Sequence, residues 1–435
     1  MREVGPALRL QGAVRVPGDK SISHRALIMG SLAQGRSRVS NLSPAADVAR
    51  TAEALRRCGA WMRSDRAGGL DFEGAGAGRT LHTPQTSLDC GNSGTTMRLM
   101  SGVLAGHRLR AVLDGDASLR RRPMGRVADP LRAMGAIVET TQGTAPLTVE
   151  GRPPLRGMEH VMTVPSAQVK SAILLAALNG DGPTTVVEAA PTRDHTERML
   201  RLCGIEVATT DGGHRVCVEP GRLGAFSLRV PGDLSSAAFF LGLAATRTGW
   251  RVTCPGVTLN RGRTGFLEVL RHMGASVEVR EGEVPDGGEP MGDVEVCGTR
   301  LRATTIGGAL VPRCIDELPL LAVLATQAEG TTVIRDAAGL RLKESDRIAS
   351  VVDGLTELGA RCQRFDDGMA VEGPVDLRAA QLDSGGDHRL AMAWAVAGSL
   401  VGPGGGSTRI MGAEAVAVSY PGFFEDLGTL LAWPR

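Results

Sequence analysis

The chain has 435 residues, a formal net charge of +2 and only 3% aromatic residues. This length exceeds what one hydrophobic core usually supports and predicts two large domains. The balanced charge and the scarcity of aromatic rings argue against a nucleic-acid-binding surface. Eight scattered cysteines, with no CxxC pair among them, argue against a zinc site or a disulfide framework. They predict reduced thiols in a cytoplasmic protein.

One pattern of helices and strands recurs six times along the chain. Each repeat opens with a helix that is apolar on almost every face, and such helices belong in a protein interior. In chain order we expect these helices at residues 26–33, 97–105, 172–178, 237–245, 318–325 and 390–397. The pattern predicts a fold with buried helices at the centre and sheets outside, with three repeats in each of two domains.

A second, amphipathic helix follows in most repeats and ends at a glycine. These glycines are Gly59, Gly135, Gly204, Gly274 and Gly359. Glycine after the last helical residue is the usual C-terminal cap, and the β-branched residues that follow it predict a strand. Each repeat is therefore a βαβαββ-type unit in an α/β fold.

Polar residues gather in the turns that open the apolar helices. The turns lie at 18–21, 91–95, 165–168, 231–236, 314–317 and 385–389. Ser, Asp and Asn in such turns are often ordinary N-caps. Helix N-termini also bind anions, and parallel helices would bring these turns together. Cationic side chains in or near the turns would complete a site for a ligand with several phosphate or carboxylate groups: Lys20, Arg25, Arg98, Lys343, Arg347 and Arg389.

Lysine is rare, since 46 of the 49 basic residues are arginine and only Lys20, Lys170 and Lys343 are not. Lysine is a compact ammonium with an adjustable pKa, whereas arginine stays protonated. We expect functional roles for Lys20 and Lys343. For Lys170, the solvated side of a helix is the alternative.

Nine motifs in order resemble the 5-enolpyruvylshikimate-3-phosphate synthase family. They are GDKSISHRAL (18–27), GNSGTTMR (91–98), GDASLRRRPMGR (115–126), SAQVKSA (166–172), TRDHTE (192–197), PGDLSSAAF (231–239), IDELP (315–319), LKESDR (342–347) and DHRLAM (387–392). The resemblance runs from Leu10 to Leu427. It implies a two-domain inside-out α/β barrel, with residues 1–18 and 231–435 in one domain and 19–230 in the other. The active site would lie in the cleft between the domains.

The resemblance also implies the reaction. The enolpyruvyl group of phosphoenolpyruvate passes to the 5-hydroxyl of shikimate-3-phosphate, and phosphate leaves. This is a step of the shikimate pathway towards chorismate and the aromatic amino acids. No metal or organic cofactor is expected, and the partners are small molecules rather than nucleic acid or membrane. A monomer is the default expectation.

Site residues follow from the matched motifs. The expected catalytic residues are Asp316, Glu344, Lys20 and Lys343: Asp316 would accept the proton of the 5-hydroxyl, and Glu344 or Lys343 would manage the proton at the methylene carbon. Expected shikimate-3-phosphate contacts are Lys20, Ser21, Arg25, Ser166, Ala167, Gln168, Arg193, Asp316 and Lys343. Expected phosphoenolpyruvate contacts are Lys20, Gly94, Arg122, Gln168, Arg347 and Arg389.

Two positions bear on the phosphoenolpyruvate site. Many family members carry a lysine near the C-terminus where this chain has Val418, so one cation is missing. Gly94 is the residue type that this family associates with sensitivity to glyphosate, an analogue that competes for the same site. We therefore expect this protein to be a glyphosate target.

The sequence argues against two other classes of function. The sister enolpyruvyl transferase acting on UDP-N-acetylglucosamine usually has a cysteine where this chain has Ala117, and a Lys-Asn pair where it has Lys20 and Ser21. A nucleic-acid-end-processing enzyme or a polyanion-binding protein is the alternative from another class. Low net charge argues against RNA, and the carboxylates Asp316 and Glu344 would not help a simple anion receptor.

Overall fold

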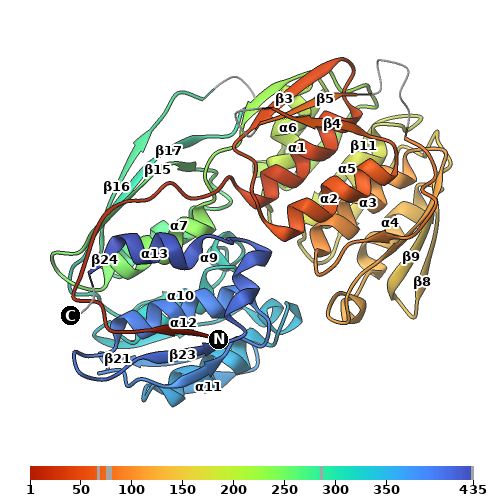
Figure 1. Cartoon of the computed structure of the whole chain (residues 1–435). Helices are drawn as coiled ribbons and strands as arrows, with labels where there is room; N and C mark the ends of the chain where they lie inside the picture. Colours follow the sequence, from red (N-terminus) through yellow and green to blue (C-terminus); the bar gives the residue numbers. More distant parts are fainter. Residues whose placement is uncertain (66–68, 75–80, 285–287, 433–435) are drawn as a thin grey trace. The chain divides into compact units, whose positions relative to one another are not determined.

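The computed structural model describes residues 1–65, 69–74, 81–284 and 288–432. Contacts divide the chain into unit 1, comprising Met1–Pro17, Pro231–Glu283 and Pro290–Arg435, and unit 2, comprising Gly18–Val230 and Val284–Glu289 (Figure 1). The expected division differs at Gly18 and at 284–289. Glu289 groups with unit 2 because its Oε1 lies 2.6 Å from Nδ1 of His195.

The described part of unit 2 contains three four-stranded sheets with one common pattern. The first strand pairs parallel with the second, which pairs antiparallel with the last strand of a hairpin. In spatial order the sheets are β14 (Ser227–Arg229), β3 (Arg36–Ser40), β5 (Leu70–Glu73), β4 (Trp61–Ser64); β6 (Leu88–Asp89), β7 (Arg110–Asp114), β9 (Thr144–Glu150), β8 (Ile137–Thr141); and β10 (Glu159–Met162), β11 (Thr184–Glu188), β13 (Arg215–Val218), β12 (Val207–Thr210).

Unit 1 uses the same strand pattern in two sheets of its described part and a shorter version in a third. These sheets are β16 (Ser276–Glu281), β17 (Met291–Cys297), β15 (Arg251–Thr258), β2 (Arg9–Ala13), β24 (Leu431–Ala432); β18 (Thr305–Ile306), β19 (Gly330–Ile334), β21 (Gly368–Gly373), β20 (Arg361–Phe365); and β1 (Arg2–Val4), β23 (Thr408–Met411), β22 (Gln381–Asp383). The N-terminal strand β2 lies parallel to β15, so the start of the chain completes a sheet of the C-terminal half.

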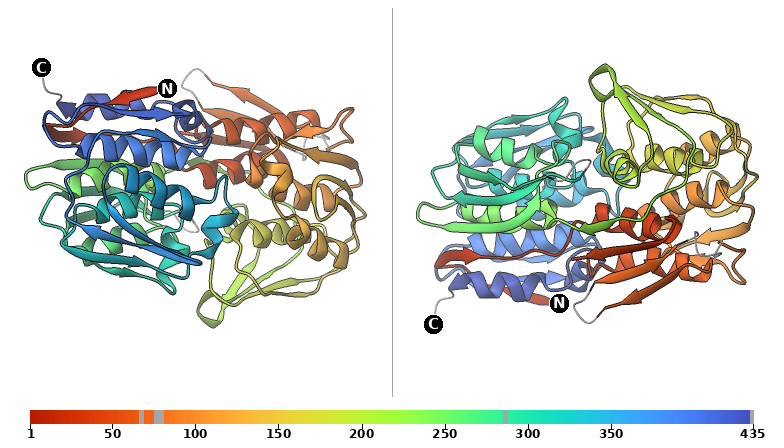
Figure 2. Two further views of the ribbon diagram at one scale, coloured as in Figure 1. Left: turned by 90° about the horizontal axis from the view of Figure 1, so that it is seen from below. Right: turned by 90° about the horizontal axis from the view of Figure 1, so that it is seen from above.

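The apolar helices form where the sequence predicts them. They are α1 (Lys20–Leu32), α3 (Gly94–Ala105) and α5 (Ala167–Ala177) in unit 2, and α7 (Leu234–Ala245), α10 (Leu318–Ala325) and α12 (His388–Leu400) in unit 1. Every residue of α7, α10 and α12 is buried. Within each unit the ribbons of Figure 2 show these helices flanked by sheets, and residues of all three helices belong to the hydrophobic core of their unit. The expectation of buried apolar helices is confirmed.

The amphipathic helices end as the glycine pattern predicts. They are α2 (Ala46–Arg57), α4 (Gly125–Ala133), α6 (His195–Leu202), α8 (Gly265–His272) and α11 (Arg347–Glu357). The glycine after each has a φ between 81° and 105°, a backbone region that favours glycine. In all five, the next N–H donates to the carbonyl of a leucine five residues earlier, as in Ala60 to Leu55. This is the Schellman cap, and the predicted helix ends are confirmed.

Shorter helices complete the described chain. They are α9 (Leu310–Cys314), α13 (Phe423–Leu430), and the 3-10 turns η2 (Leu119–Arg121), η3 (Asp211–Gly213), η4 (Ala338–Leu342) and η5 (Ala413–Val418). All eight cysteines are free thiols. Among the described residues, each helix is too short or too polar to span a bilayer.

Close packing of α3 against α5 depends on Gly102. A Cβ built on Gly102 would lie 2.1 Å from the carbonyl oxygen of Ala172, which is backbone and cannot swing away. We expect Gly102→Ala to lower the free energy of unfolding by about 1–3 kcal/mol in urea titrations. Gly428 in α13 has nothing within 4 Å of an added Cβ. Gly428→Ala should therefore be neutral or stabilising by up to about 1 kcal/mol, and equal losses in both variants would contradict the packing argument.

Candidate functional site

The turns before the apolar helices are built by side-chain caps. Asp19, Ser93, Ser166, Asp233 and Asp387 each accept a hydrogen bond from a backbone N–H in the first turn of the helix. Helix α10 differs, because Glu317 occupies its cap position and makes no such bond. Asp316, one residue earlier, is therefore not used as a helix cap.

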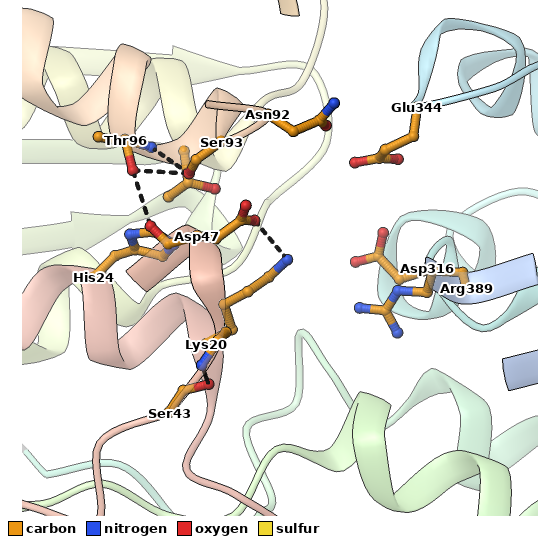
Figure 3. A network of polar contacts seen from close by, with 12 residues as sticks. Lys20, His24, Ser43, Asp47, Asn92, Ser93, Thr96, Asp316, Glu344 and Arg389 are labelled. Atoms are coloured by element: carbon orange, nitrogen blue, oxygen red, sulfur yellow. Dashed lines mark hydrogen bonds and ion pairs between the residues drawn. The ribbon is translucent and has the colours of Figure 1, made fainter. Parts of the chain in front are cut away.

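In unit 2, Lys20 lies at the first position of α1 and reaches Asp47 near the start of α2. Its Nζ lies 2.9 Å from Oδ2 of Asp47, and both side chains are largely buried (Figure 3). Sequence reasoning did not single out Asp47. An acidic residue in the first turn of the second helix of a repeat was the available signal, but the same residue also suits an ordinary helix start.

Arg25, one turn along α1, is 3% exposed, and each of its three guanidinium nitrogens donates one hydrogen bond. Its Nε donates to Oγ1 of Thr196 at 2.7 Å and its Nη2 to Oγ of Ser171 at 2.6 Å. Burial lowers the pKa of the Arg25 guanidinium to about 10, the charge of Glu197 opposes that shift, and Arg193 lowers the pKa further. Arg25 thus stays charged at neutral pH beside a second arginine, an arrangement that favours an anionic ligand.

Lys170 is not on a solvated helix face, so that alternative was wrong. The side chain is 1% exposed, and its Nζ lies 2.7 Å from carboxylate oxygens of both Glu188 and Glu197. Burial works to lower the pKa of Lys170, but the two carboxylates outweigh burial and raise it. Glu188 also accepts the hydroxyl of Thr192 at 2.6 Å. The buried ions therefore hold the loop that carries Thr192 and Arg193.

The start of α3 brings the glycine-rich turn beside two arginines. Nη1 of Arg98 donates to Gln168 at 2.7 Å, and Gln168 donates in turn to Thr95 at 2.8 Å. Nη2 of Arg122 donates to Asn92 at 2.5 Å. A Cβ on Gly94 would lie 2.7 Å from Nη1 of Arg98 and 3.2 Å from Nη1 of Arg122. A methyl group at position 94 would therefore displace the guanidinium group of Arg98 and crowd that of Arg122.

His24 is a packed residue within α1. Its Nδ1 lies 2.7 Å from Oγ1 of Thr51, which is in turn 2.7 Å from Oγ1 of Thr96. Desolvation first, and then the charges of Lys20 and Arg25, hold the pKa of His24 well below its usual value. The neutral ring lies at one end of a hydrogen-bond chain that passes through Thr51 and Thr96 to Ser93, and Figure 3 shows the contact between Thr96 and Ser93.

In unit 1, Asp316 and Glu344 lie among cations. Lys343 Nζ is 3.4 Å and Arg347 Nη1 is 3.8 Å from Oδ1 of Asp316. Arg347 Nη2 donates to Glu344 at 2.7 Å. The side chains of Asp316 and Glu344 are 15% and 20% exposed, so both keep access to solvent. This part of unit 1 brings together four of the residues that the motifs single out.

Arg347 is held more tightly than the motif suggests. The side chain is 1% exposed, and its Nε and Nη2 both donate to Asp387, at 2.7 Å and 3.1 Å. Burial opposes its charge, but Asp387 and Glu344 raise the pKa of Arg347 above its usual value. Asp387 therefore occupies the Nε–Nη2 edge of Arg347, and that edge is not available to a substrate.

Arg389 belongs to a second buried network. Its Nη1 lies 3.8 Å from Glu317, whose carboxylate accepts the hydroxyl of Ser235. Arg263 donates to that hydroxyl at 2.9 Å and to Asp233 at 2.7 Å. Glu317 is thus a structural carboxylate. Sequence reasoning missed Arg263, which lies in a loop outside the motifs.

The remaining expected positions fall at helix starts and at the C-terminal turn. Ser166 caps α5, and Ala167 is its first residue. Ser21 accepts a hydrogen bond from Arg25 through its backbone carbonyl at 2.8 Å. Val418 is half-buried at the end of η5. No group of three or more potential ligands that could hold a metal occurs among the described residues.

Comparison with known proteins places this chain in a family. A family model described as "EPSP synthase (3-phosphoshikimate 1-carboxyvinyltransferase)" matches residues 4–427. The chain belongs to this family. It is 49% identical over 429 residues to the 3-phosphoshikimate 1-carboxyvinyltransferase of Anaeromyxobacter sp. (strain K), covering 98% of this chain and 94% of that protein. It is 48% identical over 429 residues to that of Geobacillus kaustophilus (strain HTA426), covering 97% and 98%.

Solved structures agree with the EPSP synthase assignment. EPSP synthase from Acinetobacter baumannii matches with a TM-score of 0.87 and 40% identity, covering 99% of this chain and 98% of that one. The enolpyruvyl transferase NikO from Streptomyces tendae matches with a TM-score of 0.77 and 19% identity, covering 98% and 96%. The second likeness shows the fold alone, a mixed α/β architecture.

The buried lysine gives a stability prediction. Lys170→Met leaves Glu188 and Glu197 without their shared cation, and we expect it to cost about 3–5 kcal/mol of unfolding free energy. Combining it with Glu188→Gln and Glu197→Gln should recover part of that loss. Arg215 forms an exposed pair with Glu159, with both side chains nearly half-exposed. As a control, Arg215→Met should cost less than about 1 kcal/mol; a similar cost at both sites in urea unfolding would contradict this account.

Proposed function

We infer that this chain is a 3-phosphoshikimate 1-carboxyvinyltransferase, an enolpyruvyl transferase of the shikimate pathway. It transfers the enolpyruvyl group of phosphoenolpyruvate to the 5-hydroxyl of shikimate-3-phosphate and releases phosphate. The family match over nearly the whole chain, with relatives at about half identity, carries this conclusion. Its substrates are small molecules.

We propose that unit 2 supplies most of the shikimate-3-phosphate contacts. Arg25 and Arg193 are cationic neighbours, and each lies beside hydroxyl groups or a helix start that can donate hydrogen bonds. Ser166, Ala167 and Gln168 form the start of α5, where backbone N–H groups favour a phosphate. Lys20 and Ser21 complete this set, together with Asp316 and Lys343 of unit 1.

Phosphoenolpyruvate is assigned to the cations around Gly94 and to those of unit 1. Lys20, Gly94, Arg122 and Gln168 come from unit 2, and Arg347 and Arg389 from unit 1. Since Asp387 occupies one edge of Arg347, any direct substrate contact would use Nη1, a buried nitrogen that makes no hydrogen bond to the described residues. Val418 adds no charge where many family members have lysine. The remaining cations therefore have to neutralise the charge of phosphoenolpyruvate without that lysine.

The proposed chemistry is addition followed by elimination. Asp316 takes the proton of the 5-hydroxyl while the hydroxyl oxygen bonds to C2 of phosphoenolpyruvate. At the same time C3, the methylene carbon of phosphoenolpyruvate, gains a proton. The C2–O bond to phosphate then breaks with the electron pair leaving on phosphate, and C3 loses a proton to restore the double bond. Glu344 or Lys343 handles the proton at C3, with Lys20 as a further donor. Cations nearby stabilise the departing phosphate.

We also propose a finer description of the fold. The βαβαββ order, the parallel first strand of each sheet and the buried helices support an inside-out α/β barrel with three repeats in each unit. Monomeric state and cytoplasmic location are proposed with it, because the free thiols suit a reducing compartment.

Phosphate release from phosphoenolpyruvate tests the function. In buffer with EDTA, we expect release with shikimate-3-phosphate and none with UDP-N-acetylglucosamine. Asp316→Asn and Glu344→Gln should each lower kcat by roughly 10²–10⁴-fold, the usual share of acid–base catalysis. The exposed residues Asp353 and Glu357 provide matched controls. Asp353→Asn and Glu357→Gln should keep full activity. If folded protein releases no phosphate with either acceptor, the proposed function is wrong.

Glyphosate inhibition tests the role of Gly94. We expect inhibition competitive with phosphoenolpyruvate in the unaltered protein. Gly94→Ala should weaken glyphosate binding roughly tenfold, about 1.4 kcal/mol, and raise KM for phosphoenolpyruvate less, because the added Cβ displaces Arg98 and Arg122. Gly182 has open space around an added Cβ. Gly182→Ala should therefore change neither constant. Unaltered glyphosate affinity in Gly94→Ala would refute the close-approach argument.

A further inference from the structure

The guanidinium group of Arg25 is held along one edge by two neutral hydroxyl groups of unit 2. Thr196, in the first turn of α6, accepts a hydrogen bond from Nε at 2.7 Å, and Ser171 of α5 accepts one from Nη2 at 2.6 Å. The two hydroxyl oxygens lie 2.6 Å apart. Two neighbouring nitrogens of a guanidinium group commonly donate to the two oxygens of one carboxylate. Here two hydroxyl oxygens take the place of that carboxylate.

The proton of each hydroxyl has an acceptor within this cluster. The Ser171 hydroxyl donates to the backbone carbonyl of Ala167 at 2.6 Å. A hydroxyl has a single proton, so Thr196 donates in the contact between the two hydroxyls. The hydrogen bonds therefore run in one direction and end on Ala167, the first residue of α5. Both hydroxyls keep lone pairs for Arg25.

Helix packing, rather than solvent, fixes the two hydroxyls. Ser171 is 1% exposed and Thr196 is fully buried. The residue after Thr196, Glu197, lies 2.7 Å from Nζ of Lys170, which is the residue before Ser171. This buried ion pair joins the start of α6 to α5. Removing either hydroxyl would leave a buried N–H of a charged group without its acceptor, which costs more than losing a bond between neutral groups.

The hydroxyl pair holds Arg25 without neutralising it. Among the described residues, Arg25 forms no ion pair. The charge of Glu197 acts on Arg25, but Glu197 itself pairs with Lys170. In unit 1, by contrast, Asp387 occupies the Nε–Nη2 edge of Arg347 with a negative charge. Neutral acceptors fix a guanidinium group and preserve its attraction for an anionic ligand.

Two N–H groups of Arg25 remain for a ligand. A guanidinium group has five N–H groups, and Arg25 donates three of them, to Thr196, Ser171 and the backbone carbonyl of Ser21. The other two, one on each terminal nitrogen, make no hydrogen bond to the part of the chain that the structure describes. Such a pair can donate together to one carboxylate or phosphate group.

We propose that Thr196 and Ser171 are positioning residues for Arg25, which direct its two remaining N–H groups towards an anionic group of shikimate-3-phosphate. The proposal rests on the proposed function, in which Arg25 contacts that substrate. Both hydroxyls are buried, and the protons of both are donated within the cluster. Their effect on the reaction therefore passes through Arg25 and falls on the affinity for shikimate-3-phosphate rather than on the chemical step.

Titration calorimetry with shikimate-3-phosphate tests the proposal. Thr196→Val keeps the shape of the side chain and removes its hydroxyl, and Ser171→Ala removes the other hydroxyl. We expect each variant to raise Kd roughly tenfold to a hundredfold, the usual effect of losing a hydrogen bond to a charged group. Thr196→Ser restores a hydroxyl at the same position and should bind within about threefold of the unaltered protein.

Steady-state kinetics separate positioning from a general loss of structure. In Thr196→Val and Ser171→Ala, KM for shikimate-3-phosphate should rise as Kd does. At saturating substrate, kcat should change less than about threefold, and so should KM for phosphoenolpyruvate. If both variants bind shikimate-3-phosphate as tightly as the unaltered protein does, or if kcat falls as far as affinity, the proposal is wrong.

Two fully buried hydroxyls of unit 1 provide matched controls. Ser399 of α12 donates to the carbonyl four residues earlier at 2.9 Å, as Ser171 does, and Thr326 donates to the carbonyl of Val323 at 2.7 Å. Ser399→Ala and Thr326→Val should leave Kd for shikimate-3-phosphate unchanged. An equal loss of affinity in these controls would show that removing any buried hydroxyl weakens binding, and would contradict the positioning role.

Nuclear magnetic resonance of the Arg25 Nε–H, assigned with Arg25→Lys, measures the hold on the guanidinium group without substrate. We expect slow exchange with water in the unaltered protein, and exchange at least about tenfold faster in Thr196→Val but not in Thr326→Val. Equally slow exchange in Thr196→Val would overturn the proposal. If the unaltered protein shows slow exchange but binds no shikimate-3-phosphate, the proposed function is wrong, whereas the hydroxyl pair still holds Arg25.

Discussion

Both units depend on keeping a positive charge in a dry interior. Lys170 in unit 2 and Arg347 in unit 1 are each 1% exposed. An isolated buried ion costs several kcal/mol, so each is surrounded by carboxylates: Glu188 and Glu197 around Lys170, and Asp387 and Glu344 around Arg347. The buried ions also fix neighbouring polar residues, because Glu188 holds Thr192 and Arg347 lies close to Asp316.

The apolar helices decide where polar chemistry can occur. A helix buried on every side has no solvated face, so its only polar positions lie at the ends, where N–H groups need partners. Caps such as Asp19 and Asp387 satisfy some of these groups and place a cationic residue directly after or near them, Lys20 and Arg389. The fold thus concentrates cations at helix starts, where the free N–H groups also favour anions.

Two arginine environments are set by close neighbours, one beside Gly94 and one at Arg347. Gly94 keeps space for two guanidinium groups that a methyl group would displace. Arg347 gives its Nε–Nη2 edge to Asp387, while its Nη1 is buried and makes no hydrogen bond to the described residues.

The sequence alone determined the helices, their glycine ends and the family, because these are local patterns: all-apolar runs, Leu-x-x-x-Gly stops and contiguous motifs. Tertiary structure decided the partners. The pairing of Asp47 with Lys20, the burial of Lys170 between Glu188 and Glu197, the Asp387 grip on Arg347 and the place of Glu289 beside His195 all join residues distant along the chain. A local pattern cannot show which carboxylate neutralises which cation, since that choice depends on how the helices pack.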